Sequence, residues 1–121
     1  MQFGITNPND NEGLMDLISC VTHIVFLVTG RGNVVGSAVS PCIKITGNHD
    51  TFRRMEEDMD FDASPVLEGQ CSQDELAEYL THMVAEIASG KETKSEMLGH
   101  REYYIPYKYQ EKEVGRKCVC R

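Results

Sequence analysis

The sequence predicts an α/β domain built in three layers, with helices on both faces of a mostly parallel sheet. Two observations carry this prediction. Short apolar runs typical of strands alternate along the chain with amphipathic helical patterns. One of these runs, residues 24–28, contains no polar residue, which is typical of a strand covered on both faces. We therefore expect residues 24–28 to form a central strand of a Rossmann-like sheet.

The composition excludes several classes of function. The chain has 121 residues, which is enough for one hydrophobic core. Its 19 acidic and 12 basic residues give a net charge of −7, which disfavours nucleic acid as a partner. No apolar run approaches the roughly 20 residues that a membrane-spanning helix needs, so no membrane segment is expected. The chain shows no secretory pattern and has five cysteines, an odd number, so a reducing cytoplasm is expected.

Residues 11–20 are expected to form a helix, because apolar residues in and just after this stretch recur at helical spacing. These residues are Leu14, Leu17, Ile18 and Val21. A second strand is expected over residues 42–46, where apolar residues flank Lys44. A helix should follow, because Asn48 or Asp50 can cap it and the apolar residues behind them share one face. That face consists of Phe52, Met55 and Met59.

The best-defined helix should begin after Ser72. Ser72 and Glu75 have the spacing of a capping box, and Gly90 can end the helix in a left-handed conformation. The apolar stripe between them consists of Leu76, Leu80, Met83, Val84 and Ile87. Thr93 and Glu96 repeat the capping-box spacing before a short turn.

The domain is expected to span residues 1–103, followed by a tail over residues 104–121. The tail ends with Cys118 and Cys120, which lack the two-residue spacer of redox and zinc pairs, so we interpret both as reduced thiols. The four histidines share no metal-ligand spacing, so the sequence does not predict a zinc site.

A candidate anion-binding loop follows the first strand. Its residues are Thr29, Gly30, Arg31, Gly32 and Asn33. Ligands of open α/β sheets usually bind beyond the carboxyl ends of strands. The two glycines let backbone N–H groups approach an anion, and the guanidinium of Arg31 can hold a carboxylate through two parallel hydrogen bonds. A glycine-rich turn with a purely structural role fits the same residues equally well.

Lys44 is a second candidate cation for an anionic ligand. It lies between Ile43 and Ile45 in the expected strand, so its side chain should point to the opposite face. An exposed lysine at the edge of the sheet is the alternative, and the residues alone slightly favour it.

Three acidic residues after the second predicted helix are weaker candidates for metal binding: Glu57, Asp58 and Asp60. A hard divalent cation can compensate such a run of carboxylates. Arg53 and Arg54 stand four residues before Glu57 and Asp58, however, and salt bridges within one helix are the favoured interpretation.

Several segments, taken in order, resemble the C-terminal part of the galactarate and altronate dehydratases. The resemblance covers residues 22–102. The segments that carry it are Thr29-Gly30-Arg31-Gly32, Pro41-Cys42-Ile43-Lys44, Asn48, residues 53–60 and residues 90–99. Together these motifs are far more specific than any one of them.

The resemblance implies an iron-dependent lyase that removes water from a sugar acid, such as galactarate or altronate, to give a 2-keto-3-deoxy acid. It implies that Arg31 and Lys44, with the rest of the loop and Asn48, bind the substrate and its carboxylate. It further implies that Fe²⁺ is held mainly by domains outside this chain. Glu57 and its acidic neighbours are the weaker candidates for the metal or the sugar hydroxyls.

The chain departs from the family pattern at Asn33, Asp62 and Ser64, where the family has Ser, Asn and Gly. Family enzymes carry further domains before this one. We therefore expect a C-terminal domain or subunit, incomplete alone, that works with the remaining domains or a companion subunit. The alternative is a non-catalytic module that binds a small anion or a nucleotide, and the acidic run disfavours the nucleotide. The sequence leaves open whether copies assemble into a homo-oligomer.

Overall fold

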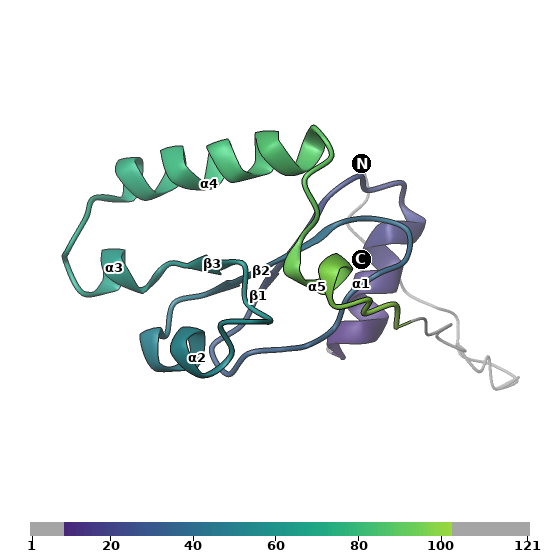
Figure 1. Ribbon diagram of the computed structural model, residues 1–121, viewed down its shortest axis with the longest axis horizontal. Coiled ribbons are helices and arrows are strands. Elements are labelled where there is room, and N and C mark those ends of the chain that lie inside the picture. Colours follow the sequence, from purple (N-terminus) through teal and green to yellow (C-terminus); the bar gives the residue numbers. More distant parts are fainter. Residues whose placement is uncertain (1–8, 103–121) are drawn as a thin grey trace, which may run out of the picture.

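The computed structural model describes residues 9–102, which form a small sheet with helices packed against it (Figure 1). The predicted tail over residues 104–121 lies outside the described residues. The elements in chain order are α1 (Asp10–Ser19), β1 (Val25–Val28), β2 (Cys42–Thr46), α2 (His49–Arg54), β3 (Phe61–Asp62), α3 (Ser64–Leu67), α4 (Gln73–Ala88) and α5 (Lys94–Met97). Both strand pairs are parallel. The predicted α/β class with a parallel sheet is confirmed, whereas the three-layer, Rossmann-like arrangement stays a prediction.

The position of β1 in the sheet differs from the prediction. The described strands lie in the order β1-β2-β3, so the central strand is β2 and β1 lies at an edge. Alternate residues of β1 are open to solvent, because Phe26 is 46% and Val28 is 72% exposed. All five residues of β2 are buried, although this strand carries a lysine in its middle. The absence of polar residues from residues 24–28 therefore led to the wrong prediction of the central strand, which is β2.

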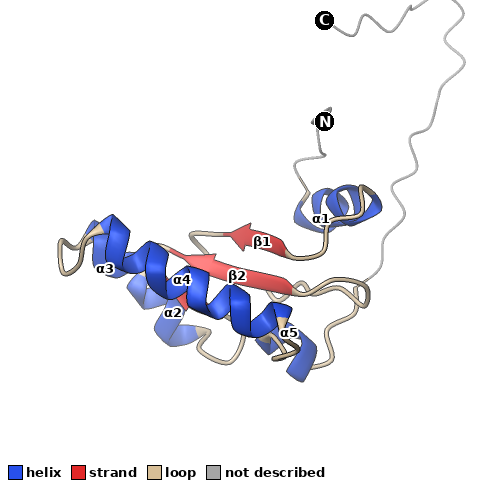
Figure 2. Cartoon of the chain, turned by 90° about the horizontal axis from the view of Figure 1, so that it is seen from above, coloured by secondary structure: helices blue, strands red, loops and turns tan. Residues whose placement is uncertain are grey.

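Side chains alternate along β2 and belong to two clusters on opposite faces. Ile43 and Ile45 pack with Ile87 of α4, which runs over this face of the sheet (Figure 2). Cys42 points to the other face and packs with Val25 and with apolar residues of α1. Full burial of one isoleucine side chain contributes about 1.5–3 kcal/mol, so the two clusters fix which helix covers which face.

The ends of the last two helices follow their capping signals. Ser72 and Glu75 form the predicted capping box at the start of α4, and Gly90 follows its end with a φ of 106°. Thr93 and Glu96 form the second capping box at the start of α5. No helix among the described residues is long and apolar enough to cross a membrane.

Helix α2 begins as predicted but ends early. The Asn48 side-chain oxygen accepts hydrogen bonds from the backbone N–H groups of Asp50 and Thr51, so Asn48 is the cap. The helix ends at Arg54, and the predicted continuation to Met59 is wrong. Met59 is nevertheless fully buried, because the turn after α2 directs it into the interior. The apolar side chain of Met59 therefore reflects its burial in the core and is not evidence that the helix continues to this residue.

Candidate functional site

The loop of residues 29–33 lies beyond the carboxyl end of β1 and is tied to its neighbours by hydrogen bonds. The N–H of Thr29 donates to the carbonyl of Ile45 over 2.9 Å, which continues the pairing of β1 with β2. The carbonyl of Gly30 accepts from the hydroxyl of Thr51 over 2.9 Å, which joins the loop to α2. The loop therefore has a fixed position beyond the carboxyl ends of the parallel strands, where ligands of α/β proteins usually bind.

Gly32 and Asn33 have structural roles in this loop. Gly32 has a φ of 85°, and a Cβ atom there would collide with the sulfur of Met55. The Asn33 side-chain oxygen accepts from the N–H of Val35 over 2.8 Å, and its amide donates to Asp10. The structural interpretation thus accounts for these two residues, but it does not account for the arginine between the glycines.

Arg31 is exposed and makes no hydrogen bond or ion pair with another residue in the described part of the chain. An exposed cation is stable in this state because water solvates it. Its planar guanidinium can therefore accept a carboxylate through two parallel hydrogen bonds without first breaking an internal contact.

Asn48 also lies beyond the carboxyl end of a strand, here β2, and its side-chain oxygen caps α2. The next residue, His49, belongs to a polar pair that sequence reasoning missed: its Nδ1 lies 2.9 Å from Oδ2 of Asp62. The other oxygen of Asp62 accepts from the N–H of Ser64 over 2.9 Å. Partial burial raises the pKa of the Asp62 carboxyl, but hydrogen bonds from Ser64 and His49 outweigh burial and lower the pKa overall. A lone histidine gave no spacing signal, and its partner lies on β3, which was not predicted.

Lys44 lies inside the domain. As predicted, its side chain points away from the face of Ile43 and Ile45. It is fully buried, however, and its Nζ has no hydrogen-bond partner among the described residues. The interpretation as an exposed edge lysine is therefore wrong, because β2 is the central strand. The structure thus places Arg31 at the surface and Lys44 in the interior.

The interpretation of the acidic run as salt bridges within one helix is wrong. Met55 leaves the helical conformation with a φ of −125° and a ψ of 38°, so Glu57 and Asp58 lie beyond the end of α2. Neither Arg53 nor Arg54 forms an ion pair with another residue between positions 9 and 102.

Asp60 has a structural role. Its two carboxylate oxygens accept hydrogen bonds from the backbone N–H groups of Lys44 and Lys94, each over 2.8 Å. The Nζ of Lys94 donates to the carbonyl oxygen of Met59 over 2.7 Å and to that of Glu56. Asp60 therefore joins the central strand to the start of α5, and Lys94 brings a positive charge to the acidic run.

The described residues do not fit a ferrous ion. No three histidine, cysteine, aspartate or glutamate side chains within residues 9–102 are grouped so that they could hold a metal. Of the weaker candidates, Asp60 has both oxygens in hydrogen bonds to backbone, and Glu57 and Asp58 lie on the turn after α2.

Cys42 does not qualify as a thiolate nucleophile. Burial raises the pKa of its thiol to about 11, with the charge of Lys44 lowering it and that of Asp60 raising it. The thiol is therefore protonated at neutral pH, whereas a nucleophilic cysteine needs the thiolate.

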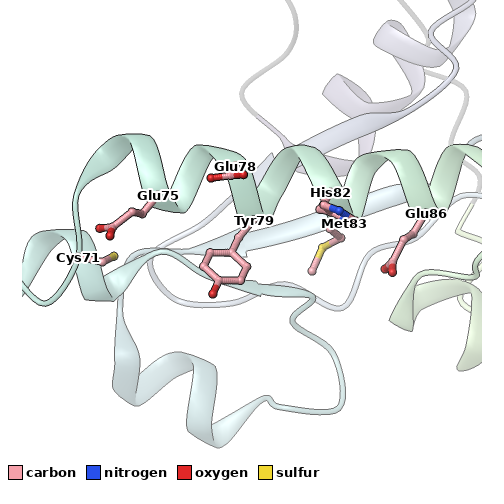
Figure 3. Close-up of a pocket in the computed structure, with 7 residues that line it drawn as sticks. All are labelled: Cys71, Glu75, Glu78, Tyr79, His82, Met83 and Glu86. Atoms are coloured by element: carbon pink, nitrogen blue, oxygen red, sulfur yellow. The ribbon is translucent and has the colours of Figure 1, made fainter.

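Two hollows in the described surface lie outside the predicted site. The larger of the two, about 850 Å³, runs along α4 from Cys71 to Glu86 (Figure 3). It is lined by Cys71, Glu75, Glu78, Tyr79, His82, Met83 and Glu86. The smaller, about 380 Å³, is mainly apolar and includes Val28, Gly47 and Leu67. Neither includes Arg31 or Lys44, so neither is the predicted carboxylate site.

The parallel α/β sheet and the order of the sequence motifs agree with the expected lyase-family domain, and comparison with known proteins gives the family. The chain matches the family model of the D-galactarate/altronate dehydratase C-terminal domain over residues 1–111. This chain belongs to that family, and the resemblance found in the sequence is confirmed.

The chain is also similar to the beta subunit of (2R)-sulfolactate sulfo-lyase from Chromohalobacter salexigens. The two are 39% identical over 85 residues, which are 70% of this chain and 22% of that subunit. The chain thus spans about a fifth of the length of this relative.

Proposed function

We propose that this chain is the part of a lyase that binds an acid group of the substrate, and that companion domains or a companion subunit complete the enzyme. The proposed substrate is a sugar acid such as galactarate or altronate, which loses water to give a 2-keto-3-deoxy acid. The family name supports a sugar acid. The name of the similar sulfo-lyase subunit gives sulfolactate, another hydroxy acid. A carboxylate is common to these compounds, so carboxylate recognition is the task we propose for this chain.

The exposed guanidinium of Arg31, which has no ion-pair partner among the described residues, carries this proposal. Hydrogen bonds to Ile45 and Thr51 hold the backbone of its loop, so the side chain starts from a fixed position beyond the carboxyl end of β1. No ion pair within residues 9–102 has to break before a ligand binds. A hydrogen-bonded pair between charged groups of this kind contributes about 1.5–3 kcal/mol.

Elimination from a hydroxy acid removes the proton next to a carboxylate, and negative charge then spreads onto the carboxylate oxygens. Two parallel N–H donors from Arg31 stabilise that charge. The proton acceptor and Fe²⁺ belong to the companion domains in this proposal, because the described residues offer no metal site. Asn48 stays a predicted ligand of the substrate beyond the carboxyl ends of the strands, and Lys44 stays a predicted ligand apart from the loop, in the interior of the domain.

Reconstitution tests this division of tasks. We expect no turnover of galactarate, altronate or sulfolactate with ferrous iron by the 121-residue chain alone. Turnover should appear when the rest of the enzyme is added, and the acid that reacts identifies the substrate. Robust turnover by the chain alone contradicts the proposal.

Substitution of Arg31 tests its role directly. Arg31→Lys keeps the charge but loses the planar fork, so it should lower kcat/KM of the reconstituted enzyme at least about tenfold, nearly as much as Arg31→Ala. The melting temperature should not change, because Arg31 has no ion-pair partner in the described part of the chain. Arg53→Lys, at another exposed arginine, is the matched control and should keep full activity. A lower melting temperature with unchanged kcat/KM would make Arg31 a structural residue.

A calorimetric titration with galactarate, ATP and NAD separates this function from that of a nucleotide-binding regulatory module. We expect galactarate binding that Arg31→Ala weakens. Binding of a nucleotide alone would overturn the proposal in favour of the regulatory module.

A further inference from the structure

A second group of anion-binding atoms surrounds Gly36, in the segment between β1 and β2. The backbone N–H of Gly36 donates to a carboxylate oxygen of Glu102 over 2.9 Å, across 66 positions of sequence. Gly36 is buried. A carboxylate on a buried backbone N–H is the elementary contact of many anion-binding sites.

Close packing explains why residue 36 is a glycine. A Cβ atom there would lie 2.7 Å from the carbonyl oxygen of His100 and 2.9 Å from Cβ of Ser95. Ser95 in turn lies against β2, because its hydroxyl is 3.4 Å from the carbonyl of Cys42. The segment around Gly36 is thus pressed against the residues that follow α5, beside the first residue of β2.

Lys44 points to the same face of β2 as Cys42, against which Ser95 lies, and the backbone and Cβ of His100 lie beside Gly36. The Nζ of Lys44 is fully buried without a hydrogen-bond partner among the described residues, and Nδ1 of His100 is also buried and unpartnered. A buried ammonium with no acceptor costs several kcal/mol, so an acceptor is expected to meet it.

The charges of Lys44 and His100 reach the Glu102 carboxyl. Partial burial raises the pKa of Glu102, but the N–H of Gly36, the N–H of Glu102 itself and the charges of His100 and Lys44 lower it overall. Backbone N–H, ammonium and imidazole thus act on one carboxylate. We call these four residues, Gly36, Lys44, His100 and Glu102, the Gly36 corner.

We propose that the Gly36 corner is a binding site for a carboxylate group of an organic acid, and that the side chain of Glu102 stands in the place of that ligand in the free chain. Glu102 uses the N–H of Gly36 and leaves the Nζ of Lys44 without a hydrogen bond. A ligand carboxylate has two oxygens and can accept from both groups once Glu102 has moved out. The site rests on these contacts, and only the choice of a hydroxy acid as ligand rests on the proposed function.

Titration of the full chain with galactarate, followed by amide NMR and calorimetry, tests this site. In Glu102→Ala the competing side chain is gone, so we expect galactarate to bind at least tenfold more tightly than to the wild type. The gain should disappear in Glu102→Ala combined with Lys44→Met. Glu92→Ala, at an exposed glutamate, is the matched control and should change nothing.

A second readout keeps the test decisive if the Lys44 variant does not fold. In Glu102→Ala, the amide signals of Gly36 and His100 should shift on addition of galactarate. The gain in affinity should persist when Arg31→Ala is added, which separates this site from the one in the proposed function. If Glu102→Ala melts at a lower temperature without tighter binding, or if the shifts are confined to residues 29–33, the inference is overturned and Glu102 is a structural contact only.

Discussion

The loop of residues 29–33 and the Gly36 corner each contain a cation, but Arg31 in the loop is exposed to water and Lys44 in the corner is buried. Within residues 9–102, Arg31 is exposed to water without a partner, and the Nζ of Lys44 is buried without one. Water solvates the first at little cost, whereas burial of the second is costly without an acceptor. An unpaired cation therefore has different consequences at the two places. An exposed cation is stable and available to a ligand, whereas a buried cation is unfavourable until an acceptor binds it. Substitution of the exposed Arg31 should therefore change binding with little effect on stability, whereas substitutions around the Gly36 corner should change both.

Loss of Asp60 should have the largest effect on stability. Asp60→Ala removes the acceptor of two backbone N–H groups, those of Lys44 and Lys94, in a partly buried place. We expect the free energy of unfolding to fall by about 2–4 kcal/mol in urea titrations. Glu57→Ala is the control from the same acidic run, and because Glu57 is exposed it should change the value by less than about 0.5 kcal/mol. Equal effects of the two substitutions would show that Asp60 does not join β2 to α5.

A pair of glycine substitutions sharpens the comparison of the two regions. Gly36→Ala places a Cβ atom against the backbone of His100, so we expect a loss of about 1–3 kcal/mol in thermal or urea unfolding. Gly30→Ala meets nothing within 4 Å and should change stability by less than about 1 kcal/mol. A Gly36→Ala variant as stable as Gly30→Ala would mean that the Gly36 corner is not tightly packed.

Asn48 lies at the exposed end of the sheet, and its substitution separates capping from binding. Asn48→Ala removes the N-cap of α2 and should cost about 1 kcal/mol, whereas Asn48→Asp keeps a capping oxygen and should cost much less. Melting temperatures of the two variants check this prediction. Activity of the reconstituted enzyme is the second readout, because loss of activity in the stable Asn48→Asp variant would support contact with the substrate.

The pH dependence of Asp62 should be the smallest effect. Its folded-state pKa lies below the ordinary value of 3.8, so its hydrogen bonds stabilise the fold above that pH and stop doing so as the pH falls through the folded pKa. The difference in unfolding free energy between wild type and Asp62→Asn should therefore begin to shrink below about pH 5 and keep shrinking as the pH falls through the folded pKa. A difference that stays constant over this range contradicts the hydrogen bonds from Ser64 and His49.

Local signals located several elements correctly. The capping box at Ser72 and the glycine at position 90 fixed α4 almost to the residue, and Asn48 marked the start of α2. These signals depend on residues within one or two helical turns, so they can be read directly from the chain. The elements that were missed, β3 with two residues and α3 with four, are too short to show periodicity.

The position of the candidate binding residues was only partly predictable. The sequence placed Arg31 in a loop beyond a strand, and the structure agrees. It did not place Lys44 correctly, because burial of that side chain depends on β2 being the central strand of the sheet. The missed pair of His49 and Asp62 likewise depends on β3 aligning beside β2.

The sequence by itself determined the α/β class, the family, the long helix and the arginine loop. The tertiary structure alone decided that Asp60 joins β2 to α5, that Lys44 is buried without a hydrogen-bond partner among residues 9–102, and that Glu102 accepts from the N–H of Gly36. The physical reason is separation along the chain: these partners stand 16, 34 and 66 positions apart. Caps and amphipathic patterns arise between near neighbours, whereas contacts at such separations exist only once the sheet has brought distant segments together.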